Sequence, residues 1–135
     1  MENFILDHDI NVFCVTAMSF PDGIMDAYNK LHALVPDSKN RRIFGLSRPD
    51  ERGTIIYKAA AEETFEGEAA KPGCEEFVIE SGTYTSLVIH DFMKDLPGIG
   101  RAFTALLTTP GIDPNGLCVE WYLDDSDVRC MVRLA

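Results

Sequence analysis

The chain has 135 residues, enough for one domain with a hydrophobic core, and its hydrophobic content of 46% excludes a disordered protein. The net charge is −10, from 12 basic and 22 acidic residues. This acidity argues against nucleic acids and anionic membrane surfaces as partners, because binding to phosphates depends on lysine and arginine. It fits a cationic partner, or simply solubility.

The cysteines and histidines show no pattern of a metal site. The cysteines are widely spaced and include no C-x-x-C pair, which is typical of free thiols in a reducing compartment. They are Cys14, Cys74, Cys118 and Cys130. The three histidines lack ligand spacing, so we expect neither a metal nor a cofactor. With no signal-like N-terminus and no stretch of roughly 20 apolar residues, we expect a cytoplasmic protein.

Hydrophobic patterning predicts a strand, a helix and a hairpin in the first half of the chain. Residues 11–20 form an apolar, β-branched and aromatic run without helical period, which indicates a strand. Helical spacing then relates Ile24, Ala27, Tyr28, Leu31 and Leu34. Asp22 is placed to cap this helix and Pro36 to end it. Apolar runs at 43–47 and 54–60 flank turn-forming residues and predict a hairpin.

A linker and two strands are predicted next. Residues 61–73 are rich in alanine and glutamate with little apolar period, which is typical of a solvated connection. We expect its glutamates to form a wet surface and not a cation site. They are Glu62, Glu63, Glu66 and Glu68. Short strands are predicted at 76–80 and 84–91, on either side of Ser81-Gly82.

A second helix and a second hairpin complete the chain. Asp95 and Pro97 are placed to open the helix. One face of this helix carries Ile99, Ala102, Phe103 and Leu106. Strands at 118–124 and 128–134 then form a hairpin around an Asp-Ser-Asp turn. Each half of the chain therefore has the predicted order β-α-β-β.

The two halves also repeat each other at a constant shift. The matching pairs are Gly23 with Gly98, Ala27 with Ala102, Tyr28 with Phe103 and Leu31 with Leu106. Two copies indicate a pseudo-two-fold domain, because a solenoid needs at least three. The sharpest difference at this shift is Gly45 against Glu120, which puts a carboxylate in an otherwise apolar strand.

We therefore predict an α+β fold for a single domain over residues 1–135. It consists of two pseudo-symmetric β-α-β-β units, with the helices on one face of an antiparallel sheet. The first unit covers about residues 10–62 and the second about 76–135, joined by a linker at about 63–75.

The environment of Glu120 depends on how the last hairpin pairs. Strand alternation places Glu120 and Tyr122 on one face and Trp121 on the other. Depending on the register, Met131 or Arg133 lies opposite Glu120. We expect the apolar face of the second strand to pack under the helices. That face carries Val128, Cys130, Val132 and Leu134.

Residue chemistry leaves two interpretations of Glu120 open. With Tyr122 and Met131 it can form a floor that holds an organic cation. Such a charge pair is worth about 4 kcal/mol at about 4 Å and an effective dielectric constant near 20, before desolvation. Alternatively, Arg133 forms a cross-strand ion pair with Glu120 on a wet face, worth roughly 0.2–1 kcal/mol.

Three stretches carry a resemblance to a known family. They are Arg42-Ile43-Phe44-Gly45, Ile79-Glu80-Ser81-Gly82-Thr83-Tyr84 and Val119-Glu120-Trp121-Tyr122-Leu123. Together with the duplicated layout they resemble the GyrI-like small-molecule-binding domain, the effector-binding domain of AraC-type and multidrug-responsive transcription regulators. The resemblance implies a ligand cleft between the two units, in which Glu120 meets lipophilic cations. The cleft walls that it implies are Tyr122, Tyr84, Phe92, Trp121, Met131 and Met18.

The resemblance implies a binder of hydrophobic, cationic, drug-like small molecules. Because the chain carries no helix-turn-helix, we expect a standalone module that does not bind nucleic acid itself. It could act as a homodimer or with a separate regulator protein. Two alternatives stay open: a small hydrolase that uses Glu120, as in some members of the family, and a protein-binding inhibitor or corepressor. Trp121 alternates to the other face from Glu120, which weakens a joint catalytic role, and no catalytic residue is assigned.

Overall fold

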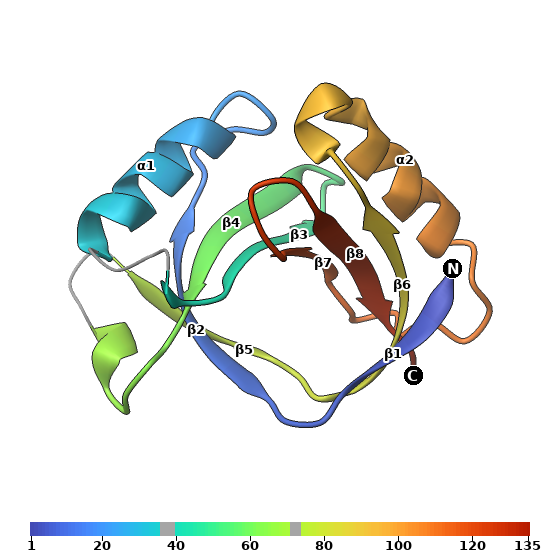
Figure 1. The fold of residues 1–135 in the computed structure, drawn as a ribbon, viewed down its shortest axis with the longest axis horizontal. Coiled ribbons are helices and arrows are strands. Elements are labelled where there is room, and N and C mark those ends of the chain that lie inside the picture. Colours follow the sequence, from blue (N-terminus) through green and yellow to red (C-terminus); the bar gives the residue numbers. More distant parts are fainter. Residues whose placement is uncertain (36–39, 71–73) are drawn as a thin grey trace.

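The computed structural model describes residues 1–35, 40–70 and 74–135, which form an eight-stranded antiparallel sheet and two α-helices (Figure 1). The sheet curls into a half-barrel, and both helices cover one of its faces. The strands are β1 (Glu2–Leu6), β2 (Ile10–Thr16), β3 (Ile43–Pro49), β4 (Ile55–Glu62), β5 (Glu75–Ile79), β6 (Gly82–Ile89), β7 (Cys118–Tyr122) and β8 (Val128–Arg133). The helices are α1 (Ile24–Leu34) and α2 (Pro97–Leu106), with short 3₁₀ turns η2 (Glu68–Ala70) and η3 (Phe92–Lys94). The predicted α+β fold is confirmed.

The strand order joins the two halves of the chain in one sheet. From edge to edge it is β1-β6-β8-β7-β3-β4-β2-β5. The halves meet at β3 and β7, and each has the same order from the centre outwards. The edge strands are exchanged, because β1 pairs with β6 and β5 pairs with β2. Each half therefore completes its sheet with a strand from the other half.

Strand β1 was not predicted from the sequence. Leu6 is its one buried side chain and Phe4 is half-buried, and β5 has the same burial pattern. So short an edge strand shows little alternation of apolar and polar residues. Its hydrogen bonds go to β6, in the other half of the chain, and no local pattern reveals such a pairing.

The predicted helices are present and Pro97 opens α2 as predicted, but neither Asp22 nor Asp95 caps its helix with its side chain. Helix α1 begins after Gly23 and α2 after Leu96, and neither start has a side-chain cap hydrogen bond. Asp95 pairs instead with Arg101, one turn into α2. Pro97 occupies the first turn of α2, where its missing N–H costs nothing. The predicted helix end at Pro36 and the linker residues 71–73 lie outside the described residues.

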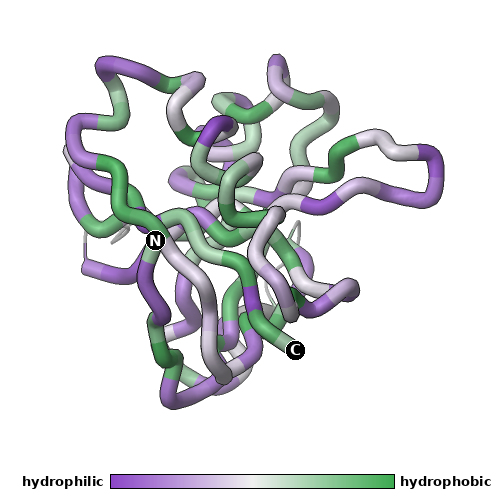
Figure 2. The backbone as a smooth tube through the Cα atoms, turned by 90° about the vertical axis from the view of Figure 1, so that its right-hand side faces the viewer, coloured by the Kyte–Doolittle hydropathy of each residue, from purple (hydrophilic) through white to green (hydrophobic). Residues whose placement is uncertain are grey.

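Hydrophobic clusters cover both faces of the sheet. Under α1, Ala27 and Leu31 of the helix pack with Phe13, Val15, Val35, Ala59 and Ala61. Under α2, Ala102, Phe103 and Leu106 of the helix pack with Phe92, Val128, Cys130 and Val132. The inner cluster, on the opposite face, consists of Leu6, Ile10, Val12, Cys14, Phe44, Leu46, Ala60, Ile79, Tyr84, Val119 and Met131. Figure 2 shows that several loops projecting from the body are hydrophilic. Each fully buried large apolar side chain stabilises the fold by about 1.5–3 kcal/mol.

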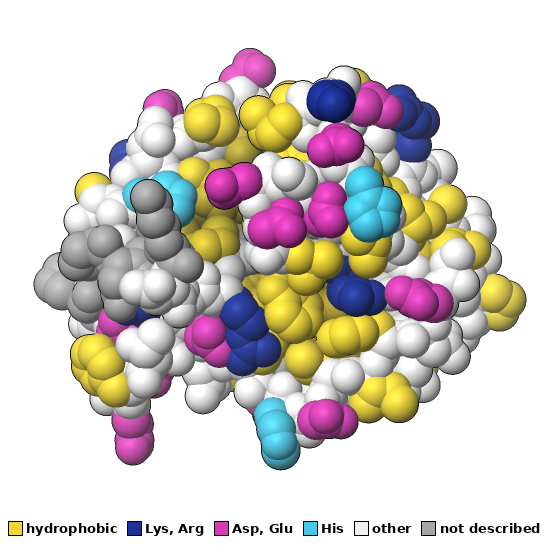
Figure 3. Space-filling view, viewed as in Figure 1, with side chains coloured by type: hydrophobic (Ala, Val, Ile, Leu, Met, Phe, Trp, Pro, Cys, Tyr) yellow, Lys and Arg dark blue, Asp and Glu magenta, His cyan; other side chains and the backbone are white. Residues whose placement is uncertain are grey.

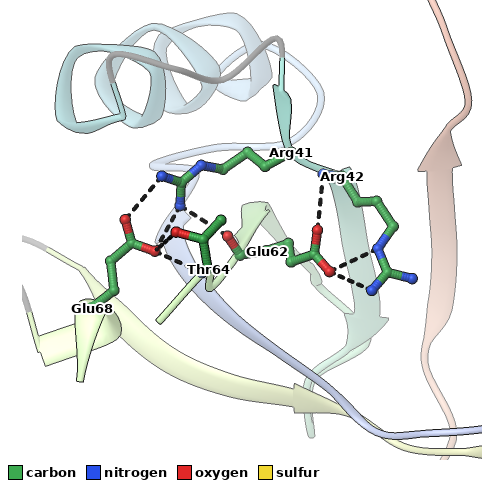
Figure 4. Close-up of polar contacts among 5 residues, drawn as sticks. All are labelled: Arg41, Arg42, Glu62, Thr64 and Glu68. Atoms are coloured by element: carbon green, nitrogen blue, oxygen red, sulfur yellow. Dashed lines mark hydrogen bonds and ion pairs between the residues drawn. The ribbon is translucent and has the colours of Figure 1, made fainter. Parts of the chain in front are cut away.

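Two ion pairs hold the segment that follows β4 (Figure 4). The guanidinium of Arg41 donates to both carboxylate oxygens of Glu68, at 2.8 and 2.9 Å, and both side chains are at most 4% exposed. Arg41 thereby holds the pKa of Glu68 down at about 2. Arg42 pairs with Glu62 beside it. The predicted wet surface is therefore wrong for Glu62 and Glu68, because their partners Arg41 and Arg42, just before β3, were not visible in the local charge pattern.

Cys14, Cys118 and Cys130 are free thiols, as predicted. Burial raises the pKa of Cys14 and Cys130 to about 12 and that of Cys118 to about 11. These thiols therefore stay protonated at neutral pH and are poor nucleophiles. In the described part of the chain, no helix is long and apolar enough to cross a membrane.

Candidate functional site

Glu120 lies at the centre of the sheet, where the two halves meet. It pairs with Gly45 of β3 on one side and with Cys130 of β8 on the other. Both predicted hairpin partners, Met131 and Arg133, are therefore wrong. The turn sets this register, because the N–H of Leu123 donates to the Asp127 carbonyl at 3.0 Å and so places Tyr122 opposite Val128. A shift of one residue moves every side chain to the other face.

The corrected register puts Glu120 on the face that packs under the helices. Its neighbours there include Cys130, and its side chain is only 7% exposed. The apolar face of β8 packs under the helices as predicted, but Glu120 and Tyr122 share that face, whereas the prediction had placed them on the opposite one. A carboxylate buried beneath helices differs from one on a wet face, because it loses most of its hydration.

Two tyrosine hydroxyls hold one oxygen of the carboxylate. Tyr57 of β4 and Tyr122 of β7 both donate to Glu120 Oε1, at 3.0 and 2.5 Å. Tyr28 of α1 extends the network, since its hydroxyl lies 2.8 Å from that of Tyr57 and donates to the Phe44 carbonyl at 3.1 Å. Each tyrosine hydroxyl has a single proton, so while Tyr57 donates to Glu120, the proton of Tyr28 is shared between the Tyr57 hydroxyl and the Phe44 carbonyl. The network joins both halves of the chain.

The second carboxylate oxygen, Oε2, has no such partner. No described residue donates a hydrogen bond to it, and none forms an ion pair with Glu120. Oε2 is not one of the fully buried polar atoms that lack a partner. It therefore lies at the edge of accessible space. Burial raises the pKa of Glu120, and the hydrogen bonds from Tyr122 and Tyr57 counteract this only in part.

Aromatic rings surround this carboxylate. Tyr122 meets Tyr28 and Phe92 edge to face, with ring centroids 6.1 and 5.4 Å apart. Phe20 stacks on Tyr57 at 6.0 Å. We call this set the Glu120 cluster: Glu120, Phe20, Tyr28, Tyr57, Phe92 and Tyr122. It lies between α1 and η3, which leads into α2.

Gly45 makes room for the cluster. A Cβ atom at this position would lie 2.2 Å from the Tyr57 hydroxyl and 2.9 Å from both Glu120 Oε1 and the Tyr28 hydroxyl. Real Cβ atoms essentially never approach other atoms so closely. Gly45 and Glu120, the sharpest difference between the repeated segments, are therefore direct neighbours, and the glycine allows the three tyrosines and the carboxylate to meet.

The structure brings together three of the predicted site residues, namely Glu120, Tyr122 and Phe92. Tyr84 and Met131 belong to the inner cluster, on the opposite face of the sheet. Trp121 packs against that cluster too, as its alternation with Glu120 predicted. Met18 is 88% exposed, in the connection between β2 and α1.

Sequence reasoning missed Phe20, Tyr28 and Tyr57. Tyr28 was assigned to the buried face of its helix, and Phe20 to the end of a strand that in fact stops at Thr16. Tyr57 lies in a predicted hairpin strand, and no sequence feature distinguishes it as a site residue. One signal was available, because Gly45 next to a buried carboxylate indicates that other groups need the space of its missing side chain.

An acidic turn lies beside the cluster. Asp124 and Asp127 belong to the β7–β8 connection. This connection is tied to η3, because the Phe92 N–H donates to the Ser126 carbonyl at 2.9 Å. Figure 3 shows acidic side chains grouped between the two helices, next to exposed hydrophobic ones. The potential near the cluster is therefore negative, which favours the approach of cations.

Comparison with known proteins places the fold among solved structures. No protein-family model matches the chain, and no curated protein matches its sequence. The fold is similar to that of an integron cassette protein from the mobile metagenome of Vibrio cholerae, with a TM-score of 0.75 and 11% identity over 99% of this chain and 95% of that one. It is also similar to SAV2435 bound to tetraphenylphosphonium (TM-score 0.63, 11% identity, 98% and 93% covered). A third similar structure is a hydrolase from Listeria innocua (TM-score 0.60, 12% identity, 99% and 90% covered). At these identities the likeness establishes a shared fold.

Proposed function

We propose that this protein binds lipophilic organic cations at the Glu120 cluster. The observation that carries the proposal is a buried carboxylate among aromatic rings, with one oxygen left without a hydrogen-bond donor or cationic partner among the described residues. The shared fold with SAV2435 bound to tetraphenylphosphonium supports it, because that ligand is a lipophilic cation. The acidic turn and the net charge of −10 add a favourable long-range field.

The physical basis is charge neutralisation in a dehydrated site. A carboxylate that has lost its hydration gains most from a ligand that brings a positive charge without a tight hydration shell of its own. At about 4 Å and an effective dielectric constant near 20 the pair is worth roughly 4 kcal/mol before desolvation. The aromatic faces add cation–π attraction of about 0.5–2 kcal/mol. A neutral molecule of the same shape receives neither contribution.

A ligand has to displace part of the cluster to reach Glu120. Phe20 is the member best placed to move, because it is 46% exposed and lies in the connection of residues 17–23 outside any helix or strand. Its ring covers Tyr57 by stacking. Moving Phe20 aside opens the path to Tyr57 and the carboxylate and leaves the strands in place.

A titration with tetraphenylphosphonium tests the proposal. We expect saturable binding in calorimetry, weakened by Glu120→Gln at least about thirty-fold, which corresponds to about 2 kcal/mol. The matched control is Glu76→Gln, which removes one exposed carboxylate from β5 and should change the affinity less than two-fold. The neutral triphenylphosphine oxide should bind wild type and Glu120→Gln alike. Equal losses for the cation and the neutral molecule, or no binding by the wild type, would contradict the proposal.

A hydrolase is the second candidate. A carboxyl group with a raised pKa, hydrogen bonded to two tyrosines, has the features of a general acid or base, and a protein of this fold is described as a hydrolase. The cysteines nearby are protonated and do not offer a nucleophile. Product formation from an aromatic ester or epoxide that is lost in Glu120→Gln would favour this candidate. Binding without turnover would favour the first.

A further inference from the structure

A second candidate site lies on the sheet face opposite the Glu120 cluster. A hollow of about 620 Å³ opens between the β3–β4 hairpin, β5 and the segment that leads into β7. Its apolar lining is Leu46, Pro49, Ile56, Phe77 and Leu117. Leu46 belongs to the inner cluster, and Phe77 and Leu117 pack against it. We call this feature the hairpin hollow. Its volume falls within the range of small-molecule sites, roughly 300–1,000 Å³.

The rim of the hairpin hollow carries positive charge. Arg48, Arg52 and Lys58 line it. Lys58 is already paired, with its Nζ atom 2.6 Å from Glu75 and 6.0 Å from the centre of the Phe77 ring. The guanidinium groups of Arg48 and Arg52 form no hydrogen bond or ion pair with any residue that the structure describes.

The acidic residues at the rim form no ion pair with these two arginines in the described part of the chain. Asp50 lines the hollow, but its Oδ1 accepts hydrogen bonds from the N–H groups of Arg52 and Thr54, at 2.8 and 3.0 Å, inside the hairpin turn. Glu51 is the other carboxylate of the lining. In a chain with a net charge of −10, two unpaired guanidinium groups beside an apolar floor are a local exception.

We propose that the hairpin hollow binds a small amphipathic organic anion. A carboxylate or sulfonate of the ligand lies against Arg48 and Arg52, whose planar donor groups match such oxyanions. Its apolar body rests on Phe77 and Leu117. An anionic ligand is the opposite of what the Glu120 cluster selects, so this proposal stands independently of the proposed function.

The test uses 8-anilinonaphthalene-1-sulfonate as the probe and the full chain as the protein. We expect saturable fluorescence enhancement, with an affinity that falls about five-fold or more in the double variant Arg48→Gln/Arg52→Gln. Two controls should stay within two-fold of wild type: Arg101→Gln, which removes an exposed arginine of α2, and Glu120→Gln, which alters only the cation site. Near-ultraviolet circular dichroism checks that each variant is folded.

The outcomes are distinct for the two sites. Loss of probe binding in the double variant alone supports the hairpin hollow. Equal loss in Arg101→Gln, loss in Glu120→Gln alone, or no saturable binding by the wild type overturns it. Competition then identifies the ligand body: displacement by 1-naphthoate supports an aromatic ligand, and displacement by decanoate supports an acyl chain. Failure of both to displace the probe also overturns the proposal.

Discussion

Replacing Gly45 by alanine is expected to lower the free energy of unfolding by about 2–5 kcal/mol. The added Cβ would lie 2.2 Å from the Tyr57 hydroxyl, so that phenol has to move. Tyr57 is buried, and moving it breaks its 3.0 Å hydrogen bond to Glu120. Overpacking costs about 1–3 kcal/mol and the lost hydrogen bond to a charged group about 1.5–3 kcal/mol. The reduced freedom of the unfolded chain offsets about 0.4–1 kcal/mol.

Urea unfolding, followed by the fluorescence of the single tryptophan, Trp121, measures this change. The control is Gly100→Ala: this glycine is exposed on α2, a Cβ there meets no atom within 4 Å, and alanine should stabilise the helix by about 1 kcal/mol. Tyr57→Phe removes the hydroxyl that the new methyl group strikes. We therefore expect the Gly45→Ala/Tyr57→Phe double variant to be destabilised less than the sum of the single variants. A Gly45→Ala protein as stable as the wild type would refute the crowding argument.

Four further predictions follow from the buried carboxylates. Glu68→Gln should lower the free energy of unfolding at pH 7 by about 3 kcal/mol, because it leaves the buried Arg41 guanidinium without its counter-charge; urea unfolding measures it, and a loss below about 0.5 kcal/mol would mean that the pair contributes little. The pKa of Glu68 is lowered from 4.5 to about 2, so its contribution to stability is complete above about pH 4.5 and is lost as the pH falls towards 2; acid titrations should show a shallower decline in Glu68→Gln than in the wild type. The pKa of Glu120 is raised, so its ionised form destabilises the fold as the pH rises through that pKa, and Glu120→Gln should stabilise the ligand-free protein at pH 7 by roughly 0.5–2 kcal/mol. For the same reason tetraphenylphosphonium affinity should fall in the wild type, and not in Glu120→Gln, as the pH is lowered through the raised pKa of Glu120; the same pH dependence in both proteins would argue against a cation–carboxylate contact.

Local patterns were sufficient for most elements of the fold. Helix α1 covers the residues that the helical spacing predicted, and both hairpins lie where apolar runs flank turn formers. These signals depend on side chains a few residues apart, and every buried helix or strand repeats them. Part of the site was also predictable from local patterns, because strand alternation alone placed Glu120 and Tyr122 on one face and Trp121 on the other.

Local sequence patterns could not predict the register of the last hairpin or the residues that contact Glu120. Whether Glu120 faces Arg133 across a wet hairpin or Cys130 beneath the helices depends on one turn hydrogen bond. The two readings differ in the whole environment of the carboxylate: a partner charge and water in one, aromatic rings and dehydration in the other. Phe20, Tyr28 and Tyr57 reach Glu120 from three separate segments of the chain, and no spacing in the sequence relates them.

Short-range periodicity and residue types were enough to predict the α+β fold, both helices, seven of the eight strands and an unusual carboxylate opposite a glycine in the repeated segments. The exchange of β1 and β5 between the halves, the register of the last hairpin and the tyrosines that meet at Glu120 became visible only in the packed structure. The physical reason is that long-range pairing is selected by the simultaneous burial of many side chains, and the space left by Gly45 has meaning only when β3, β4, β7 and α1 are packed together.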